Sequence, residues 1–479
     1  MKKIIFFFTL LVTFLNSYSQ KIGFKEIDSW IEDNPGELVP IRIEFNDNID
    51  CFKLNQQFKD LQTPVNQRPK IVNRLLKEQA IKSQEFVLDF LKKQTSSKIY
   101  YHSFWIVNII VARVDAATIE KLPQFSNIAT IKIENNRFIA HDDFNLSVVD
   151  NNITPNGVEN GLIAINAPAM WELGYTGRGR LAYNYDTGVW PNHPAFSNRF
   201  IGSRFPMQQS WIGYFNEFPN GSIQNHGTHT LGTIAGLVES TNDTIGVAFG
   251  SYWIANDFVT STVQALPPIV NMIEAFQWAL NPDNDTSTTE DIPDVINNSW
   301  RWYDGNDTIH CQGFVVNLMN AIESAGIANV FSGGNSGPNN SSVNSPQRIN
   351  TSEVNTFCVG SVNGNISFPH PISNFSTRGP SQCSASGSLA IHPEVVAPGQ
   401  NVRSAWEQNN FNTISGTSMA APHVSGAILL LKEAFPFLSG EELLWALYLS
   451  AVDLGVAGED NIYGMGMIDV HAAFQHLSQ

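Results

Sequence analysis

Cysteine is scarce in this chain of 479 residues, which has only four. Four cysteines in so long a chain cannot form the dense disulfide framework of a small secreted domain. Cys358 lies in a strand-like apolar run, so we expect a buried free thiol. Cys311 and Cys383 could pair. None of the four follows a Gly-rich loop or begins a helix, so a catalytic cysteine is not expected.

Positive charge is also in short supply. From Phe138 to the C-terminus there are 9 Lys and Arg against 29 Asp and Glu, and Lys432 is the only lysine. The formal net charge of the whole chain is −16. Such an acidic surface repels phosphate, so we exclude nucleic acid and anionic lipid as partners. A content of 43% hydrophobic and 15% charged residues is typical of a globular protein, and the length predicts two domains.

A long apolar run occurs only at the N-terminus. Lys2 and Lys3 precede apolar residues from Ile4 to Leu15, and small polar residues follow. This pattern predicts a secretory signal peptide over residues 1–19. The run is too short to span a membrane. We therefore expect a secreted protein, extracellular or periplasmic, with no membrane attachment after the signal is removed.

Residues 38–136 have the pattern of a small α+β unit. Strand-like alternation at 38–45 is followed by helical spacing of apolar residues at 68–94. The later elements are strand-like runs at 99–112, a short helix at 116–122 and a strand at 128–133. The order β-α-β-β-α-β predicts a ferredoxin-like fold. No cluster of catalytic residue types lies in this unit.

Residues 142–160 are polar and predict a linker, and the pattern changes again over 161–479. Short apolar runs there alternate with Gly-rich loops and helices, which predicts a doubly wound α/β domain with a mostly parallel sheet. In such sheets, sites form where the C-terminal ends of strands meet loops. The expected strands are 181–185, 295–297, 328–331 and 356–362, and the expected helices are 270–280, 315–325 and 419–434.

Four short motifs of this second domain carry residues that suit acyl transfer. Ser418 precedes a helix within Gly416-Thr417-Ser418, which by itself also fits an ordinary helix cap. Asp186 follows a strand, His226 precedes a run of small residues, and Asn335 lies in a Gly-rich turn after a strand. An imidazole activates a serine hydroxyl, a buried carboxylate orients the imidazole, and an amide stabilises an oxyanion.

In this order and with these flanks, Asp186, His226 and Ser418 resemble the catalytic triad of subtilisin-family serine proteases. The resemblance extends over about 160–479, and it is strongest to the bacillopeptidase F-like branch. It implies that Asn335 is an oxyanion donor. Six residues correspond to the substrate-binding segments of the family, which are Ser299, Trp300, Arg301, Ser332, Gly333 and Gly334.

The resemblance also implies a zymogen that acts on protein or peptide substrates, with residues 20–141 as an inhibitory propeptide and folding chaperone. We expect a monomer that cuts itself near His141. No cofactor is expected to be required, and no metal ligand is predicted. A structural calcium ion is possible in this family, but Ala195 replaces the usual Asp ligand.

Two other functions fit parts of the pattern. A catalytically silent member could act as a binding module, but such a chain usually lacks a triad or oxyanion residue. A serine hydrolase could act on non-peptide acyl groups, against which the propeptide-like unit argues. Neither the substrate nor its primary specificity follows from the sequence.

Overall fold

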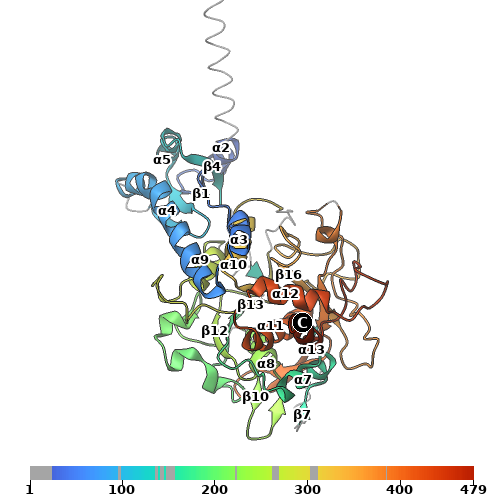
Figure 1. Cartoon of the computed structure of the whole chain (residues 1–479). Helices are drawn as coiled ribbons and strands as arrows, with labels where there is room; N and C mark the ends of the chain where they lie inside the picture. The colour runs from blue at the N-terminus through green and yellow to red at the C-terminus, as the bar shows by residue number, and fades with distance from the viewer. Residues whose placement is uncertain are drawn as a thin grey trace, which may run out of the picture. The chain divides into compact units, whose positions relative to one another are not determined.

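The computed structural model describes residues 24–94, 99–134, 139–140, 145–146, 157–221, 224–260, 269–302, 311–384 and 386–479. The predicted signal peptide and His141 lie outside these residues. Contacts between residues divide the chain into two units (Figure 1). The first comprises residues 1–50 and 73–136, and the second comprises 51–72 and 137–479. Residues 51–72 thus group with the larger unit, although they lie within the predicted propeptide.

The first unit has the predicted β-α-β-β-α-β order. Its sheet has the strand order β2-β3-β1-β4, and all three neighbouring pairs are antiparallel. Alternate residues of β1 are buried, as the sequence pattern requires. Ile41, Ile43 and Ile110 of the sheet pack with Val87 and Leu91 of α4. The elements are β1 (Val39–Phe45), α4 (Arg68–Lys92, from Asn73 on in this unit), β2 (Tyr100–Phe104), β3 (Ile109–Val114), α5 (Ala116–Ile119) and β4 (Ile128–Ile133). Helix α2 (Phe24–Asp33) was not predicted.

The second unit is built on a seven-stranded parallel sheet of order β17-β16-β15-β13-β8-β12-β9. All residues of the inner strands β8, β13, β15 and β16 are buried, which explains their apolar runs. The four predicted strands are confirmed, as is the α/β fold class. The strands are β8 (Leu181–Tyr185), β9 (Trp211–Ile212), β12 (Tyr252–Asn256), β13 (Val295–Asn298), β15 (Ala328–Ser332), β16 (Phe357–Val362) and β17 (Val395–Pro398).

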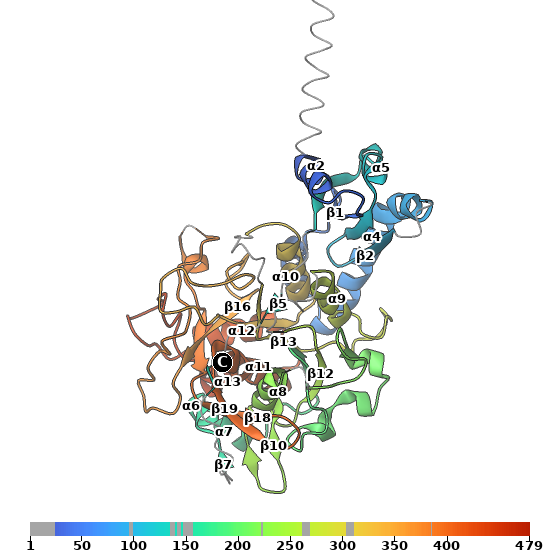
Figure 2. The same cartoon turned by 180° about the vertical axis from the view of Figure 1, so that it is seen from behind.

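Helices flank this sheet in packed pairs. Helix α8 packs against α11, and α9 packs against α10. Helix α11 also contacts the strands β8, β13, β15, β16 and β17 of the sheet, so it is the central support of the unit (Figure 2). The helices are α8 (His226–Ala235), α9 (Ile269–Ala279), α10 (Phe314–Ser324), α11 (Thr417–Ala434), α12 (Gly440–Leu449) and α13 (Val470–Leu477). Those at α9, α10 and α11 are confirmed predictions.

Smaller elements complete the second unit. The short helices are α3 (Cys51–Asp60), α6 (Asn160–Ala164) and α7 (Ala167–Glu172). The short strands are β5 (Ile139–Ala140), β6 (Asn145–Leu146), β7 (Gly157–Val158), β10 (Leu237–Val238), β11 (Asp243–Thr244), β14 (Arg301–Trp302), β18 (Val402–Ala405) and β19 (Phe411–Ser415). Strands β7 and β6 and helix α6 show that the predicted linker is not wholly irregular.

The cysteines follow the sequence interpretation in part, because Cys51 begins helix α3 although no cysteine was expected to begin a helix. Cys311 and Cys383 form a disulfide with their Cα atoms 5.2 Å apart. Cys358 in β16 is a buried free thiol, and Cys51 is a second one. Among the described residues, no helix is both long enough and apolar enough to cross a membrane.

Candidate active site

Asp186 is the first residue after β8, so it lies at the C-terminal edge of the parallel sheet. It is fully buried. Its Oδ1 accepts hydrogen bonds from the Thr187 backbone N–H at 2.7 Å, and its Oδ2 accepts one from Thr230 Oγ1 at 3.1 Å. A buried carboxylate needs such donors, because its charge is otherwise costly in a dry interior.

His226 begins helix α8 and is directed at this carboxylate. Its Nδ1 lies 2.7 Å from Asp186 Oδ1, and both side chains are fully buried. The close approach depends on Gly227, where a Cβ would lie 2.3 Å from the Gly188 carbonyl oxygen and 3.0 Å from Asp186 Cβ. The carboxylate thus holds the Nδ1 atom of the imidazole and fixes the orientation of the ring.

Ser418 lies in the first turn of α11, one residue after the helix starts. Its side chain is 1% exposed, and its Oγ donates a weak hydrogen bond to the Ser299 carbonyl oxygen at 3.4 Å. In return, Ser299 Oγ donates to the Ser418 carbonyl oxygen at 3.1 Å. The first N–H groups of a helix have no acceptor within the helix, so the start of α11 favours negative charge near Ser418.

Asn335 is held beside the start of α11 by its carbonyl end. Its Oδ1 accepts from the Thr417 backbone N–H and from Thr417 Oγ1, both at 2.9 Å. Its Nδ2 lies close to Gly416, where a Cβ would lie 3.2 Å from Nδ2. Gly416 therefore keeps the space next to the amide open, and Thr417 fixes the amide's orientation.

The two predicted substrate-binding segments lie at the ends of β13 and β15. Trp300 is 1% exposed and packs among Tyr185, Phe276 and Phe331, so its ring supports the sheet edge from within. Gln347 joins the two segments, because its Nε2 donates to the carbonyl oxygens of Trp300 at 2.7 Å and Ser332 at 2.9 Å.

The Gly-rich segment after β15 is shaped by its backbone. Gly334 has φ +107°, which L side chains rarely adopt, and its N–H donates to Thr417 Oγ1 at 2.9 Å. A Cβ at Gly333 would lie 3.0 Å from Thr377 Oγ1 and 3.1 Å from the Val359 carbonyl oxygen. Both glycines are therefore required by geometry.

Arg301 belongs to β14, which pairs antiparallel with β5, so that Arg301 is opposite Ala140 and Trp302 is opposite Ile139. Strand β6 pairs antiparallel with β19, with Leu146 opposite Ile414 and Asn145 opposite Ser415. Strand β19 ends three residues before Ser418. Strands β5 and β6 therefore pair with two strands, β14 and β19, that lie next to predicted site residues in the sequence.

Several site residues had no recognisable sequence pattern. Gln347 lies far from every motif, and Thr230 lies one helical turn after His226. Asn256 Oδ1 accepts from the Asp186 N–H at 2.9 Å, and this residue ends the unpredicted strand β12. Spacing of i, i+4 from His226 could have indicated Thr230, because such residues share a helix face.

Three further buried histidines, His229, His423 and His193, lie within hydrogen-bond distance of backbone carbonyl oxygens. His229 Nε2 lies 3.1 Å from the Val402 carbonyl oxygen, and burial lowers its pKa to about 3. His423 Nδ1 lies 2.9 Å from the Met419 carbonyl oxygen, and burial lowers its pKa to about 4. His193 is similar, with Nε2 3.0 Å from the Asn410 carbonyl oxygen and a pKa lowered by burial to about 4.

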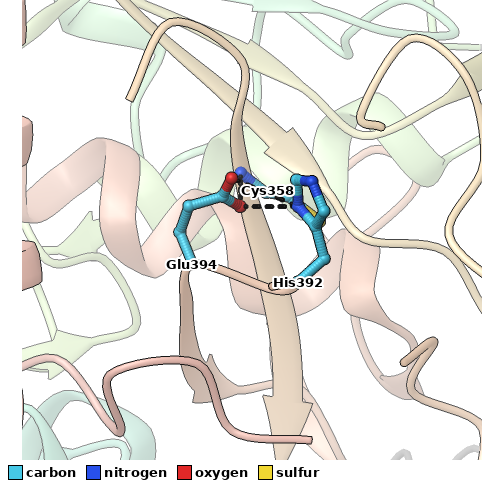
Figure 3. Close-up of side chains that lie close together, drawn as sticks. All are labelled: Cys358, His392 and Glu394. Atoms are coloured by element: carbon cyan, nitrogen blue, oxygen red, sulfur yellow. Dashed lines mark hydrogen bonds and ion pairs between the residues drawn. The ribbon is translucent and has the colours of Figure 1, made fainter. Parts of the chain in front are cut away.

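Ala195 is a buried core residue, and its carbonyl oxygen accepts from Arg199 at 2.6 Å. A guanidinium at this place does not suit a calcium site. Elsewhere in the described residues, the ligand atoms of Cys358, His392 and Glu394 lie within 4.8 Å of one another (Figure 3). Glu394 already accepts from the Cys358 N–H at 2.9 Å and from Asn350 Nδ2 at 2.5 Å, and it lies 3.2 Å from His392 Nδ1. These contacts account for the cluster as buried structural support.

The doubly wound sheet carries a buried aspartate–histidine pair at its edge and a serine at the start of its central helix, an arrangement that suits a serine peptidase. The model of the subtilase family matches residues 185–466, and the chain belongs to this family of serine endopeptidases. The match begins one residue before Asp186 and includes His226, Asn335 and Ser418.

Individual relatives agree with this family. The chain is 31% identical to bacillopeptidase F of Bacillus subtilis (strain 168) over 436 residues. The aligned region covers 86% of this chain but only 29% of that protein. It is 28% identical over 375 residues to subtilisin NAT of Bacillus subtilis subsp. natto, covering 78% of this chain and 82% of the relative. With subtilisin of Bacillus pumilus, it shares 30% identity over 318 residues, which is 66% of this chain and 98% of the relative.

Proposed function

We propose that this chain is a secreted serine endopeptidase made as a zymogen, with Asp186, His226 and Ser418 as its triad. The buried 2.7 Å hydrogen bond between His226 Nδ1 and Asp186 Oδ1 carries the proposal. In the mechanism, His226 Nε2 accepts the Ser418 Oγ proton as Oγ attacks the scissile carbonyl carbon. The imidazolium then protonates the leaving amine, and an acyl-enzyme remains. Water, deprotonated by His226, hydrolyses the ester and restores Ser418.

The oxyanion of each tetrahedral intermediate is stabilised by Asn335 Nδ2 and by the Ser418 backbone N–H. The support for this assignment is that Thr417 holds Asn335 Oδ1 and that Gly416 leaves space next to Nδ2. Such a donor is already oriented before the charge develops, so little reorganisation is needed. Water exclusion from the buried pair increases the electrostatic effect further.

Substrate main chain binds as an added strand on β14. The pairing of β5 with β14 supports this proposal, because β5 belongs to the predicted propeptide. The pairing of β6 with β19 supports a continuation of the bound chain past the nucleophile. The bond that the enzyme cuts in itself then lies between Ala140 and Asn145, in agreement with the proposed cut near His141. Residues 20–141 act as the inhibitor until they are removed.

The primary specificity pocket is bounded by the segments at Ser299–Arg301 and Ser332–Gly334. The Trp300 side chain is buried and packs against Tyr185, so its ring does not contact the substrate or select it. Gln347 holds both segments by their carbonyl oxygens and thereby sets the width between them. We propose protein or peptide substrates and a monomeric mature enzyme, with no required cofactor.

The test combines labelling and maturation of the full chain. A fluorophosphonate should label Ser418, casein should be cleaved, and the mature N-terminus should fall within residues 141–145. The Ser418→Ala chain should stay unlabelled and full length after its signal is removed. Absence of labelling in the folded chain would favour a silent binding module. Labelling without cleavage of casein or of the chain itself would favour a hydrolase of non-peptide acyl groups.

A further inference from the structure

Residues 51–72 contact the larger unit through a surface apart from the active site. This segment, called the clasp here, comprises α3, the 3-10 turn Val65–Gln67 and the start of α4 up to Val72. It groups by its contacts with residues 137–479, and α3 packs against α10 (Figure 1). The predicted cut near His141 would leave the clasp on the propeptide side. Its contacts would then join two separate chains.

The clasp buries apolar side chains along one side of α3. Cys51, Leu54 and Phe58 are at most 9% exposed, and their spacing of three and four residues places them on one helix face. Val65 fits over Gly326, which follows α10, because a Cβ at Gly326 would lie 2.7 Å from Val65 Cγ2. A helix of ten residues with such a face does not persist alone in water, so the larger unit supplies its support.

Polar contacts at the same surface centre on Glu441 at the start of α12. Asn55 Nδ2 donates to Glu441 Oε2 at 2.9 Å, and Lys59 Nζ lies 2.5 Å from Glu441 Oε1. Glu441 is 4% exposed and Asn55 is 1% exposed. A carboxylate that is this deeply buried needs its partners, and Asn55 and Lys59 both belong to the clasp.

A second carboxylate, Glu323 of α10, lies beneath the same surface and is 3% exposed. Ser352 Oγ donates to Glu323 Oε1 at 2.9 Å. Burial, and then the charge of Glu441, raise the pKa of Glu323 to about 7. Hydrogen bonds from Ser352 and Asn55 and the charge of Lys59 oppose that rise. The clasp therefore covers two carboxylates. Glu441 is bound by Asn55 and Lys59 of the clasp, whereas burial makes the charged form of Glu323 costly.

We propose that the peptidase domain has a second docking surface for its propeptide, formed by α10 and the start of α12, and that the clasp binds there as a pH-sensitive anchor. The anchor holds the cut propeptide at low pH and weakens as pH rises. This inference rests on the proposed function, since only a cut between the clasp and Arg137–Gln479 turns these contacts into a reversible interface.

The direction of the pH effect follows from Glu323. When the clasp leaves, water reaches the carboxyl group, whose pKa then returns toward 4.5. The bound state holds more protons than the released state between these two values, so affinity falls as pH rises from about 4.5 to 7 and levels off above 7. The full shift corresponds to a loss of affinity of up to about 300-fold.

Other charged residues of both signs lie at this surface. Lys59 faces both carboxylates, and Arg68 of the clasp is attracted to Glu441 and Glu442. The clasp is thus basic where the docking surface is acidic. Added salt should weaken binding at every pH without removing the pH dependence, because screening acts on the exposed part of these pairs.

The experiment uses a nicked form of the full chain that does not need its own activity. A cleavage site for an unrelated protease is placed within residues 147–156 of the Ser418→Ala chain, and the chain is cut after folding. Release of the propeptide fragment is then followed by size-exclusion chromatography at pH 5.5 and pH 8. We expect slower release at pH 5.5, by about tenfold or more.

Four substitutions separate the contributions. Lys59→Gln and Glu441→Gln should each speed release at pH 5.5 about tenfold or more, and the double variant should add little, because the two residues form one pair. Gln56→Ala is the control, since Gln56 lies on the exposed face of the same helix and should leave release unchanged. Glu323→Gln keeps the shape of the neutral side chain and should make release nearly independent of pH.

Equal release rates for Lys59→Gln, Glu441→Gln and Gln56→Ala would overturn the docking surface. Release of Glu323→Gln that kept the pH dependence of the parent would overturn the switch. Failure of the chain with Ser418 intact to mature would instead count against the proposed function, and it is measured separately from the nicked form.

Discussion

The two units of this chain place their polar groups in opposite ways. In the antiparallel sheet of the first unit, alternate residues of β1 are less buried, and Arg42 and Glu44 lie on that partly exposed face. In the parallel sheet of the second unit, both faces are covered, and Asp186 and His226 are fully buried at its edge. A buried ionisable pair is costly unless other groups support it. The second unit provides that support, and chemistry is therefore expected there.

The largest expected effect is that of Asp186→Asn. The amide keeps the shape of the carboxylate, but it no longer favours the His226 tautomer or the imidazolium, so kcat should fall about 10⁴-fold. Casein hydrolysis after maturation by added wild-type enzyme would measure this loss. Asp453→Asn, in an exposed turn of the same unit, should leave kcat unchanged. A loss below tenfold for Asp186→Asn would contradict the triad.

The next effect concerns Asn335→Ala, which removes an amide donor from the proposed oxyanion site. We expect kcat to fall about 10²- to 10³-fold with little change in KM, because the interaction forms mainly in the transition state. Asn409→Ala, at an exposed position, is the control. A change in KM alone would show that Asn335 binds the ground state instead.

In the first unit, Ile43→Ala should lower stability rather than catalysis. Ile43 is fully buried in β1, and loss of its side chain should cost about 2–5 kcal/mol. We expect less matured enzyme per cell but an unchanged kcat of the enzyme that does mature. Ile81→Ala is the matched control, because Ile81 is 68% exposed. A lower kcat with normal yield would mean that this unit takes part in catalysis.

The last prediction concerns how the folding stability of each unit changes with pH. His193 and His229 stay neutral when folded, because burial lowers their pKa values to about 4 and about 3. The unfolded chain binds protons near pH 6.5, so the second unit should lose a few kcal/mol of stability as pH falls from about 6.5 to 4. Glu44 of the first unit behaves differently. Its burial raises its pKa, but Arg42 and Lys132 outweigh this and lower it, so its contribution is lost only below about 4.5.

Urea unfolding of the Ser418→Ala chain at pH 7, 5.5 and 4 would show the difference. His193→Gln should reduce the loss between pH 6.5 and 4, whereas His476→Gln, at an exposed position, should not. If both variants lost stability equally, buried histidine would not be the cause.

Elements with strong periodicity could be predicted from the sequence, and those with mixed environments could not. The alternation at Val39–Phe45 and the buried run at Leu181–Tyr185 each belong to a strand whose faces have uniform surroundings. Helix α3 has polar residues between its buried positions, and one buried position is Asn55. The sequence alone does not indicate that Asn55 is buried, because asparagine is more typical of loops. Its burial depends on a hydrogen bond to Glu441, which is 386 positions away.

The sequence by itself determined which residue types this chain offers for acyl transfer. Asp186, His226, Asn335 and Ser418 could be predicted as the site because each stands in a short local motif that resembles a motif of the subtilisin family. Tertiary structure alone decided how they are held. Thr230 at Asp186, Thr417 at Asn335, Gln347 between two strand ends and Glu441 under the clasp act through contacts between distant segments. Hydrogen bonds and burial of that kind depend on distances across the fold, and no local pattern of side chains encodes them.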